Sequence, residues 1–183
     1  MERTESEHFV VNVNDNPQPN IIIDDKIIDN TAFNGFKLNY YTSKDVRNPE
    51  IGTSGSLGID VFTPMDFQDT TIHPGESVLI DMGIHFKIEG PFGLQVNNKS
   101  GVSVKKTLIH GAELIDQDYI GELKVHLINV GKYHQTIGPD EKIVQLVPIY
   151  KPFVNLVKHE DFDSMVSGFD TERGFGGFGS TGG

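Results

Sequence analysis

The sequence contains no cysteine, which excludes a disulfide framework, a thiolate metal site and a cysteine nucleophile. Basic residues are also few, because 15 lysines and arginines stand against 26 aspartates and glutamates and leave a net charge of -11. Such a chain is not expected to bind along a nucleic-acid backbone, so any phosphate that it binds must be met locally. The lack of cysteine fits a reducing, cytosolic setting.

Long apolar runs are missing too. No stretch approaches the roughly 20 residues that span a bilayer, and the first residues, MERTESEHFV, are charged and lack the apolar core of a signal peptide. We therefore expect a soluble cytoplasmic protein, or one in the host cytoplasm if the source is viral. We expect the 183 residues to form one domain with short additional segments.

No segment has a convincing long helical periodicity, whereas strand patterns are clear. Residues 78–88 alternate between apolar side chains and others, which predicts a half-buried strand. Residues 122–130 alternate in the same way and residues 142–150 are apolar on both faces, so both segments predict inner strands. Turn-rich segments recur at about ten-residue intervals, as in β-sandwiches and barrels. We predict an all-β fold with at most one short helix, after Gly101.

Three parts are expected along the chain. Residues 1–35 form an N-terminal arm of unknown role, whose β-branched segment IIIDDKII could add an edge strand or lie against a neighbouring subunit. Residues 36–160 carry the β domain. Residues 161–183 form a flexible C-terminal tail that ends in the glycine-rich sequence DTERGFGGFGSTGG.

The segment GAELIDQDYIGE, residues 111–122, combines carboxylates with an aromatic ring. On a strand, Asp116 and Asp118 would share one face and Tyr119 would point to the other. A carboxylate in this place could activate a water molecule, and the ring could stack on a base or a sugar. The alternative is a solvated acidic turn before a strand.

Two further places could bind an anion or a polar partner. In NNKSG, residues 97–101, Lys99, Ser100 and the backbone N–H groups could hold an anion, although most such sequences are simply turns. Asp60 and Gln145 lie inside apolar runs, so each needs a polar partner, which is either structural or a ligand.

The glycine-rich tail could wrap around a nucleotide. Arg173 could pair with phosphate, Ser180 and Thr181 could donate hydrogen bonds, and Phe178 offers a flat face to a base. The alternative is a plain flexible terminus. The tail has no lysine of the kind that a phosphate-cradling P-loop requires. The seven histidines show no metal-binding helix spacing, so we expect them on the surface or on strand faces.

Read in order, LGIDVFT, NKSGV, GAELIDQDYIGEL, EKIVQLV and RGFGGFGSTG resemble the five motifs of trimeric deoxyuridine triphosphatases (dUTPases). The resemblance begins near Phe36 and runs to Gly183. It implies a distorted β-barrel or jelly-roll subunit of the β-clip type, assembled as a homotrimer with three active sites, each built from motifs of all three chains. It also implies hydrolysis of dUTP to dUMP and pyrophosphate, which limits uracil in DNA and supplies a dTMP precursor.

This resemblance assigns roles to residues of the third motif. Asp116 matches the carboxylate that orients and deprotonates the attacking water, and Tyr119 matches the ring under the deoxyribose, where no room is left for a 2′-hydroxyl. The backbone around four residues should read the uracil edge: Gly111, Leu114, Ile115 and the facing Lys124.

The other motifs are matched to the phosphates. Asp60 corresponds to a carboxylate near the metal and water network, and Mg²⁺ is implied through the triphosphate oxygens rather than through a cage of protein ligands. The residues that match phosphate contacts are Lys99, Ser100, Gly101, Gln145, Arg173, Gly179, Ser180 and Thr181, and Phe178 matches the ring that covers uracil.

The chain departs from the family motifs in three places. Asn98 and Lys99 replace the usual Pro-Arg, and lysine keeps the charge but loses the planar fork of arginine. Glu113 replaces a glycine and would be strained if that position needs a positive φ. Leu57 replaces a small residue. The proposed base and the stacking ring remain, so we expect activity.

Three alternatives stay open from the sequence. The chain could be a dCTP deaminase relative, a regulatory nucleotide-binding protein that acts through a protein partner bound to the arm, or a structural β-protein with a flexible tail. The RGFGGFGSTG segment favours the triphosphatase. We expect no membrane contact and no direct nucleic-acid binding.

Overall fold

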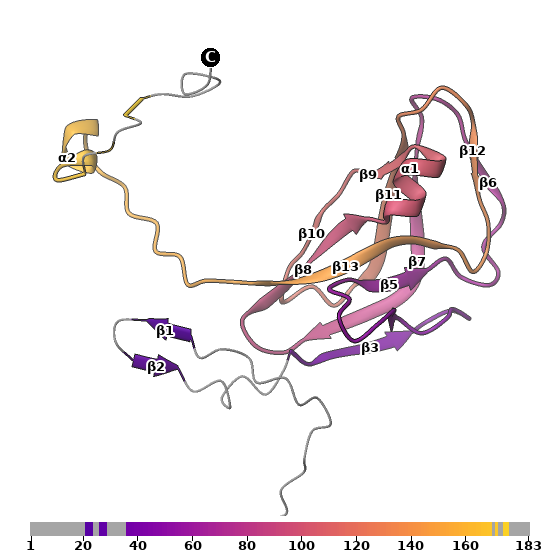
Figure 1. Ribbon diagram of the computed structural model, residues 1–183, viewed down its shortest axis with the longest axis horizontal. Coiled ribbons are helices and arrows are strands. Elements are labelled where there is room, and N and C mark those ends of the chain that lie inside the picture. The colour runs from indigo at the N-terminus through magenta and orange to yellow at the C-terminus, as the bar shows by residue number, and fades with distance from the viewer. Residues whose placement is uncertain (1–20, 24–25, 29–35, 170, 172–173, 176–183) are drawn as a thin grey trace, which may run out of the picture. The chain divides into compact units, whose positions relative to one another are not determined.

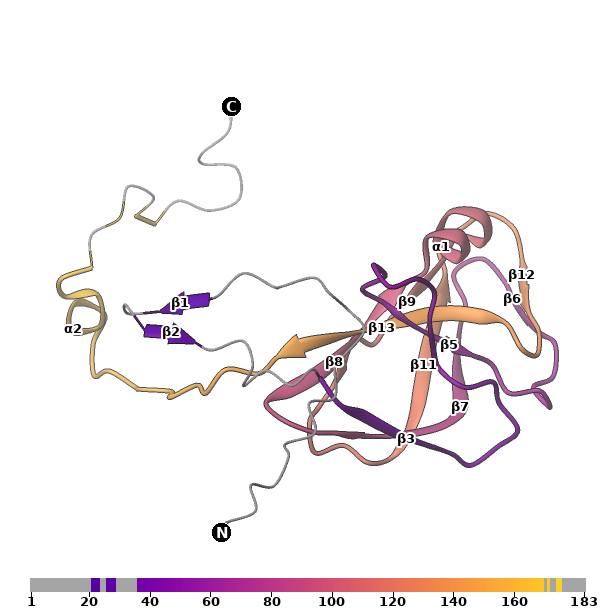
Figure 2. The ribbon, with the colours of Figure 1, turned by 60° about the horizontal axis from the view of Figure 1, so that its bottom comes forward.

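A computed structural model describes residues 21–23, 26–28, 36–169, 171 and 174–175 of the chain (Figures 1 and 2). The chain divides into two units, Met1–Lys151 and Pro152–Gly183, and each is described by itself. The division into residues 1–35, 36–160 and 161–183 stays a prediction.

Two antiparallel sheets build the first unit (Figure 1). The five-stranded sheet has the order β10 (Leu114–Ile115), β8 (Phe92–Asn98), β13 (Lys142–Tyr150), β5 (Ile59–Phe62) and β4 (Glu50–Ile51). The four-stranded sheet has the order β3 (Leu38–Thr42), β7 (Ser77–Ile88), β11 (Glu122–Asn129) and β9 (Leu108–His110). A smaller pair joins β6 (Thr70–Ile72) to β12 (Gln135–Ile137).

One hydrophobic core lies between the two sheets. Strand β7 buries every second side chain from Ile80 to Ile88, as the alternation of residues 78–88 predicts. The other sheet contributes Val61, Phe62, Leu94, Val96, Ile143, Val144 and Leu146 to the same core. Each large apolar side chain that leaves water here contributes roughly 1.5–3 kcal/mol. Both predicted inner strands, β11 and β13, have a partner strand on each side, so the all-β prediction is confirmed.

In the part of the chain that the structure describes, two short helices accompany the strands. Helix α1 (Ser100–Lys106) follows β8 and includes Gly101, close to where the sequence predicts a single short helix. Helix α2 (Phe162–Val166) belongs to the second unit and was not predicted. The Asp161 carboxylate caps α2 by accepting a hydrogen bond of 2.7 Å from the Ser164 N–H. Within the described residues, neither helix is long and apolar enough to cross a membrane.

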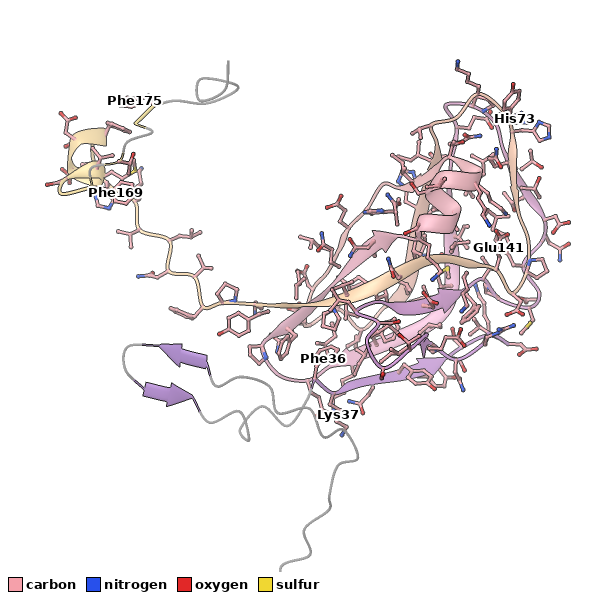
Figure 3. The ribbon with its side chains drawn as sticks, in the orientation of Figure 1. Phe36, Lys37, His73, Glu141, Phe169 and Phe175 are labelled. Atoms are coloured by element: carbon pink, nitrogen blue, oxygen red, sulfur yellow. The ribbon has the colours of Figure 1, made fainter. Side chains whose placement is uncertain are left out.

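The second unit exposes several aromatic rings. Phe162 of α2 stacks on Phe175 with their ring centroids 5.5 Å apart, and Figure 3 labels Phe175 and the nearby Phe169. Phe169 and Phe175 are 75% and 90% exposed, so this small unit has little core of its own.

The described residues of the N-terminal segment IIIDDKII form two short strands. Strand β1 (Ile21–Ile23) pairs antiparallel with β2 (Lys26–Ile28), with Ile21 opposite Ile28. Within the described residues these two strands pair only with each other and add no edge strand to a main sheet, and the alternative contact with a neighbouring subunit stays a prediction.

A β-bulge at Gly83 bends β7 where it meets the start of β11. Glu122 pairs with His85 and Lys124 pairs with Asp81, so the segment between these pairs is longer on β7 than on β11. Gly83 lies within the longer segment with a φ of 67°, and its N–H donates a hydrogen bond of 2.7 Å to Glu122 Oε1. The bulge therefore fixes the first residues of β11 against β7.

Replacing Gly83 with alanine is expected to lower the free energy of unfolding by about 1–3 kcal/mol, because a left-handed φ strains any residue that carries a Cβ. The new Cβ would also lie 2.7 Å from Lys44 Cβ. Denaturant unfolding at fixed protein concentration measures the loss. Gly55→Ala is the matched control, since no atom lies within 4 Å of the Cβ that it would add. Equal stability of the two variants would contradict the role of the bulge.

Candidate functional site

The site begins with a hairpin whose two strands lie in different sheets. Strand β10 pairs with β8, while β11 pairs with β7 and, from Leu127 onward, with β9. Within the described residues no ladder joins β10 to β11. One edge of β10 and one edge of the first half of β11 therefore have no strand partner, and their backbone groups are available to a ligand.

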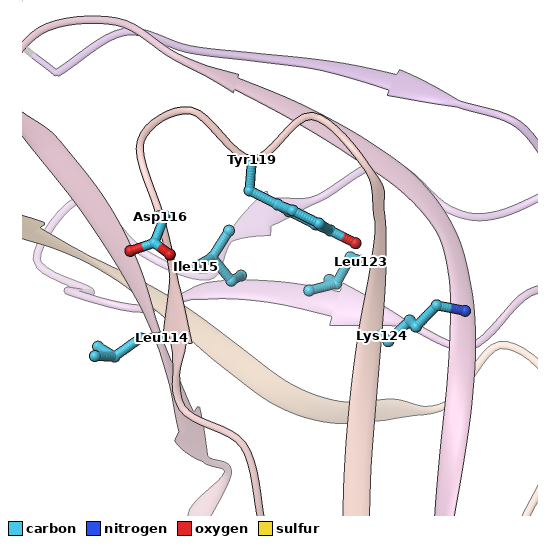
Figure 4. A pocket seen from close by; sticks show the side chains of 6 residues that line it. All are labelled: Leu114, Ile115, Asp116, Tyr119, Leu123 and Lys124. Carbon is cyan, nitrogen blue, oxygen red and sulfur yellow. The ribbon is translucent and has the colours of Figure 1, made fainter.

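A cavity of about 210 Å³ lies at this split (Figure 4). Its lining residues are Leu114, Ile115, Asp116, Tyr119, Leu123 and Lys124. Five of these six are residues that the sequence assigns to catalysis or to binding of uracil or deoxyribose, and Leu123 is the addition. Leu123 was predicted only as an apolar residue of a strand, and nothing in its type distinguished it.

Asp116 begins a tight turn that connects the two strands. The Tyr119 N–H donates a hydrogen bond of 3.1 Å to the Asp116 carbonyl oxygen, which closes a four-residue turn. The expectation that Asp116 and Asp118 share the face of a strand is wrong, because β10 ends at Ile115. The Asp116 carboxylate is exposed and lies at the cavity, where a water molecule can reach it.

The Tyr119 side chain is held in place at its hydroxyl end. Its hydroxyl donates a hydrogen bond of 2.9 Å to the Glu122 carbonyl oxygen. The ring also lies against Gly121, where an added Cβ would be 2.5 Å from the hydroxyl oxygen. Figure 4 shows the ring between Asp116 and Lys124. A fixed and 43% exposed ring offers a flat apolar surface to a sugar or base.

The charges on the β11 side of the cavity are paired. The Lys124 ammonium donates a hydrogen bond to the Asp81 carboxylate, which raises the pKa of Lys124 and lowers that of Asp81. Burial works to raise the pKa of Glu122, but hydrogen bonds from Lys44 and from the Gly83 N–H lower it below 4.5. Lys124 therefore lines the cavity while its ammonium belongs to an ion pair.

The Asp81–Lys124 pair predicts a pH-dependent contribution to stability. The folded-state pKa of Asp81 lies below 3.8, so the pair stabilises the fold above pH 3.8 and loses this effect as the pH falls through the folded-state pKa. We expect Asp81→Asn to lower the unfolding temperature slightly near neutrality and to match the unchanged protein in acid. Salt should shrink the difference, because the pair is exposed. A difference that persists at the lowest pH would contradict this.

A second group of predicted residues surrounds Asp60 on β5. Asp60 is 5% exposed, and its carboxylate lies 2.6 Å from Lys99 Nζ and 3.2 Å from Lys142 Nζ. Lys142 also pairs with Glu50, and hydrogen bonds to Glu50 and then Asp60 raise the pKa of Lys142. The buried Asp60 carboxylate is thus paired with two ammonium groups, so its polar partners are structural.

The Gln145 side chain makes its hydrogen bond beside a second, larger cavity. Its Nε2 donates a hydrogen bond of 3.0 Å to the Asn98 carbonyl oxygen. The cavity has a volume of about 520 Å³ and is lined by Ser56, Leu57, Gly58, Asn97, Asn98, His110, Gln145 and Val147. The sequence placed His110 only on the surface or on a strand face, although it directly precedes Gly111 of the third motif.

The remaining predicted residues fall in three places. Ser100 and Gly101 are exposed at the start of α1, next to Lys99. The Gly111 N–H donates a hydrogen bond of 2.9 Å to the His126 carbonyl oxygen, and a Cβ at Gly111 would lie 2.3 Å from His126 Nδ1. Arg173, Phe178, Gly179, Ser180 and Thr181 lie outside the described residues.

Two departures from the motifs have simple structural outcomes. Glu113 is not among the described non-glycine residues with a positive φ, which are Thr107 and Asp140, so its backbone is unstrained. Leu57 is 76% exposed at the mouth of the second cavity.

The described residues do not form a protein cage for a metal ion. No group of three or more histidine, aspartate or glutamate side chains is placed to hold one there. Asp60 already pairs with two lysines, and Asp116 has no second carboxylate in its cavity. This donor set fits a cation that is held mainly by ligand oxygens.

Comparisons with known proteins identify the family of the chain. A family model described as dUTPase matches residues 44–182. A deoxyuridine 5′-triphosphate nucleotidohydrolase of Ehrlichia canis is 37% identical over 150 residues, which cover 80% of this chain and 92% of the relative. The protein of the same name from Idiomarina loihiensis is 39% identical over 139 residues, which cover 73% of this chain and 86% of the relative.

Solved structures share the fold. A dUTPase of Staphylococcus bacteriophage 80alpha with dUpNHpp superimposes with a TM-score of 0.69 at 24% identity, covering 80% of this chain and 99% of that one. The dUTPase from phage phi11 of S. aureus, for which the coordination of a structural Mg(II) ion is described, gives 0.62 at 21% identity, with coverage of 69% and 99%. Together with the family model and the sequence relatives, the fold leads to one conclusion: the chain belongs to the dUTPase family.

Proposed function

We propose that this protein hydrolyses dUTP to dUMP and pyrophosphate. The observation that carries the proposal is the split hairpin, because two open strand edges, a carboxylate and a fixed aromatic ring surround one cavity. The sequence relatives are named for the hydrolysis of deoxyuridine triphosphate, and the 80alpha structure contains dUpNHpp. The dCTP deaminase and regulatory alternatives have no comparable support.

Uracil is recognised between the open edges of β10 and β11. The backbone N–H and C=O groups near Leu114, Ile115 and Lys124 line this cavity on open strand edges, and we assign the reading of the uracil edge to them. Cytosine presents the opposite pattern at its amino group and ring nitrogen, and would leave buried polar groups unpaired. Since the Lys124 ammonium is paired with Asp81, selection rests on backbone geometry.

Asp116 acts as the general base. Its carboxylate takes a proton from a water molecule as the water oxygen forms a bond to the α-phosphorus, and the bond to the β-phosphate bridging oxygen breaks to release pyrophosphate. Tyr119 packs under the deoxyribose and holds the α-phosphate in reach of this water. The hydrogen bond of 3.1 Å from the Tyr119 N–H to the Asp116 carbonyl oxygen fixes the position of the base relative to the ring.

Mg²⁺ would be held through the triphosphate oxygens, and Asp60 would act on it only through water. When bound, the ion neutralises charge on the phosphates. The paired state of Asp60 supports this indirect role, because its two lysines leave it no spare charge for a direct metal bond. Lys99, Ser100, Gly101 and Gln145 contact the phosphates themselves.

The active enzyme is a homotrimer in which each site combines residues of different chains. The supporting observation is that the cavity around Asp116 and the cavity around Gln145 share no lining residue within one chain. The tail of a further chain closes the site, with Phe178 over uracil and with Arg173, Gly179, Ser180 and Thr181 on the γ-phosphate.

The reaction keeps uracil out of DNA and supplies a dTMP precursor, in the cytoplasm or in a host cytoplasm. It needs neither a nucleic acid nor a membrane. A protein partner that binds residues 1–35 remains a further proposal.

A substrate panel tests the function. Pyrophosphate release is measured with dUTP, dCTP, dTTP and UTP at saturating Mg²⁺, and ammonia release is measured with dCTP. Selective turnover of dUTP supports the proposal. Deamination of dCTP would identify a deaminase instead, and tight binding of dUTP without turnover would identify a regulatory protein.

A further inference from the structure

A chain of polar contacts connects the hairpin to the second cavity. Asn98 Oδ1 accepts a hydrogen bond of 2.9 Å from the His110 N–H, and it lies 2.8 Å from His110 Nδ1. The other ring nitrogen, Nε2, lies 3.5 Å from Glu113 Oε1. The ring is only 11% exposed. Asn98 and Glu113 are two of the positions where the chain departs from the family motifs.

These contacts define the state of the His110 ring. An amide oxygen can only accept hydrogen bonds, so Nδ1 must carry the proton that it shares with Asn98. Nε2 lies on the other side of the ring, 3.5 Å from Glu113 Oε1. The Glu113 carbonyl oxygen also accepts a hydrogen bond of 2.7 Å from the Val96 N–H, so the residue is fixed to β8 through its backbone.

Asn98 connects His110 to the residues that we propose to bind the phosphates. It is the last residue of β8, and Lys99 follows it directly as the N-cap of α1. Its carbonyl oxygen accepts the hydrogen bond from Gln145 Nε2 at 3.0 Å. Movement of Asn98 would therefore displace Gln145 and the start of the Lys99 side chain together. The ring of a proline at this position would fix the backbone φ. Asn98 has no such ring, so its conformation depends on its hydrogen bonds.

We propose that His110 is a positioning residue for the reaction: through its backbone N–H and its ring Nδ1 it fixes the Asn98 side chain and thereby sets Lys99 and Gln145 in place for the phosphates of the nucleotide. This inference rests on the proposed function. His110 itself does not touch substrate. It acts through Asn98, and the link requires a side chain at residue 98 that can accept these hydrogen bonds.

Two variants of His110 separate positioning from general structure. His110→Ala removes both ring contacts. His110→Asn keeps an amide N–H close to the position of Nδ1 and loses only the side of the ring that faces Glu113. We expect His110→Ala to raise the KM for dUTP about 10-fold, the effect of one good hydrogen bond, while kcat changes less. His110→Asn should stay within about threefold of the unchanged protein.

Two further measurements exclude simple damage to the fold. Deoxyuridine has no phosphate, so its inhibition constant should be the same in His110→Ala as in the unchanged protein. In an Asn98→Ala background, His110→Ala should add no further loss, because the contact through which it acts is already gone. Circular dichroism and the mass of the assembly control for folding.

Each outcome decides the matter. Three results would overturn this inference but not the proposed function. The first is a KM for dUTP in His110→Ala equal to that of the unchanged protein, and the second is a loss in His110→Asn as large as that in His110→Ala. The third is a weakening of deoxyuridine inhibition in His110→Ala as large as the rise in KM for dUTP. An unchanged protein that leaves dUTP intact would overturn the proposed function and this inference with it.

Discussion

Replacing Asp116 with asparagine is expected to lower kcat for dUTP by about 10²- to 10⁴-fold, the usual contribution of a general base. Asparagine has nearly the same shape but cannot take a proton from water. Asp116 is exposed in a turn, and its carbonyl oxygen, which closes the turn with the Tyr119 N–H, is kept in the variant. The affinity for dUTP and the assembly should therefore change little. Single-turnover pyrophosphate release and equilibrium binding of dUTP measure the two quantities separately.

Asp118→Asn is the matched control for this prediction. Asp118 lies in the same turn, is also exposed, and does not line the cavity. We expect the control to keep nearly full activity, since it removes the same charge two residues from the proposed base. Activity of Asp116→Asn close to that of the control would remove the proposed mechanism.

Replacing Tyr119 with alanine is expected to reduce kcat/KM for dUTP by about 10- to 100-fold, the usual effect of losing one stacking ring. The ring lines the cavity beside Asp116 and is held by the hydrogen bond to Glu122 and by contact with Gly121. Its loss also opens space under the sugar, so the preference for dUTP over UTP should fall. Parallel kinetics with both nucleotides measure this ratio.

Tyr119→Phe isolates the contribution of the hydroxyl group. This variant keeps the ring and loses only the hydrogen bond of 2.9 Å to the Glu122 carbonyl oxygen. We expect a change of a few-fold at most, because one partly exposed hydrogen bond contributes about 0.5–1.5 kcal/mol. If Tyr119→Ala still rejects UTP as strongly as the unchanged protein does, the ring does not exclude the 2′-hydroxyl.

Strands whose side chains alternate strictly could be predicted from the sequence. Residues 78–88 predicted β7 because an apolar side chain on every second residue can be buried only on one face of a sheet. Asp60 and Gln145 are polar residues inside apolar runs, and this position correctly predicted that each side chain has a polar partner. Which partner each one has could not be predicted. Lys99 is 39 residues from Asp60 in the sequence, and their contact depends on how β5, β13 and β8 pair.

Local conformation accounts for the predictions that were wrong. Asp116 and Asp118 were placed on a strand because the alternation of side chains does not reveal where a two-residue strand ends. The segment IIIDDKII can pair with a sheet or with itself, and its composition is the same in both cases. Helix α2 is five residues long, too short to produce a helical periodicity. The separation of β10 from β11 depends on both sheets, so the cavity between them could not be predicted from either segment.

Mixed trimers of two inactive variants test most directly whether each site is shared between chains. One variant carries Asp116→Asn and the other Lys99→Ala, and the two are produced separately and then together. If the two residues serve one site from different chains, random assembly leaves about a quarter of all sites with both residues intact, and activity rises well above that of either variant alone. Activity that never exceeds that of the two separate variants would show that each chain carries a complete site and would contradict the account.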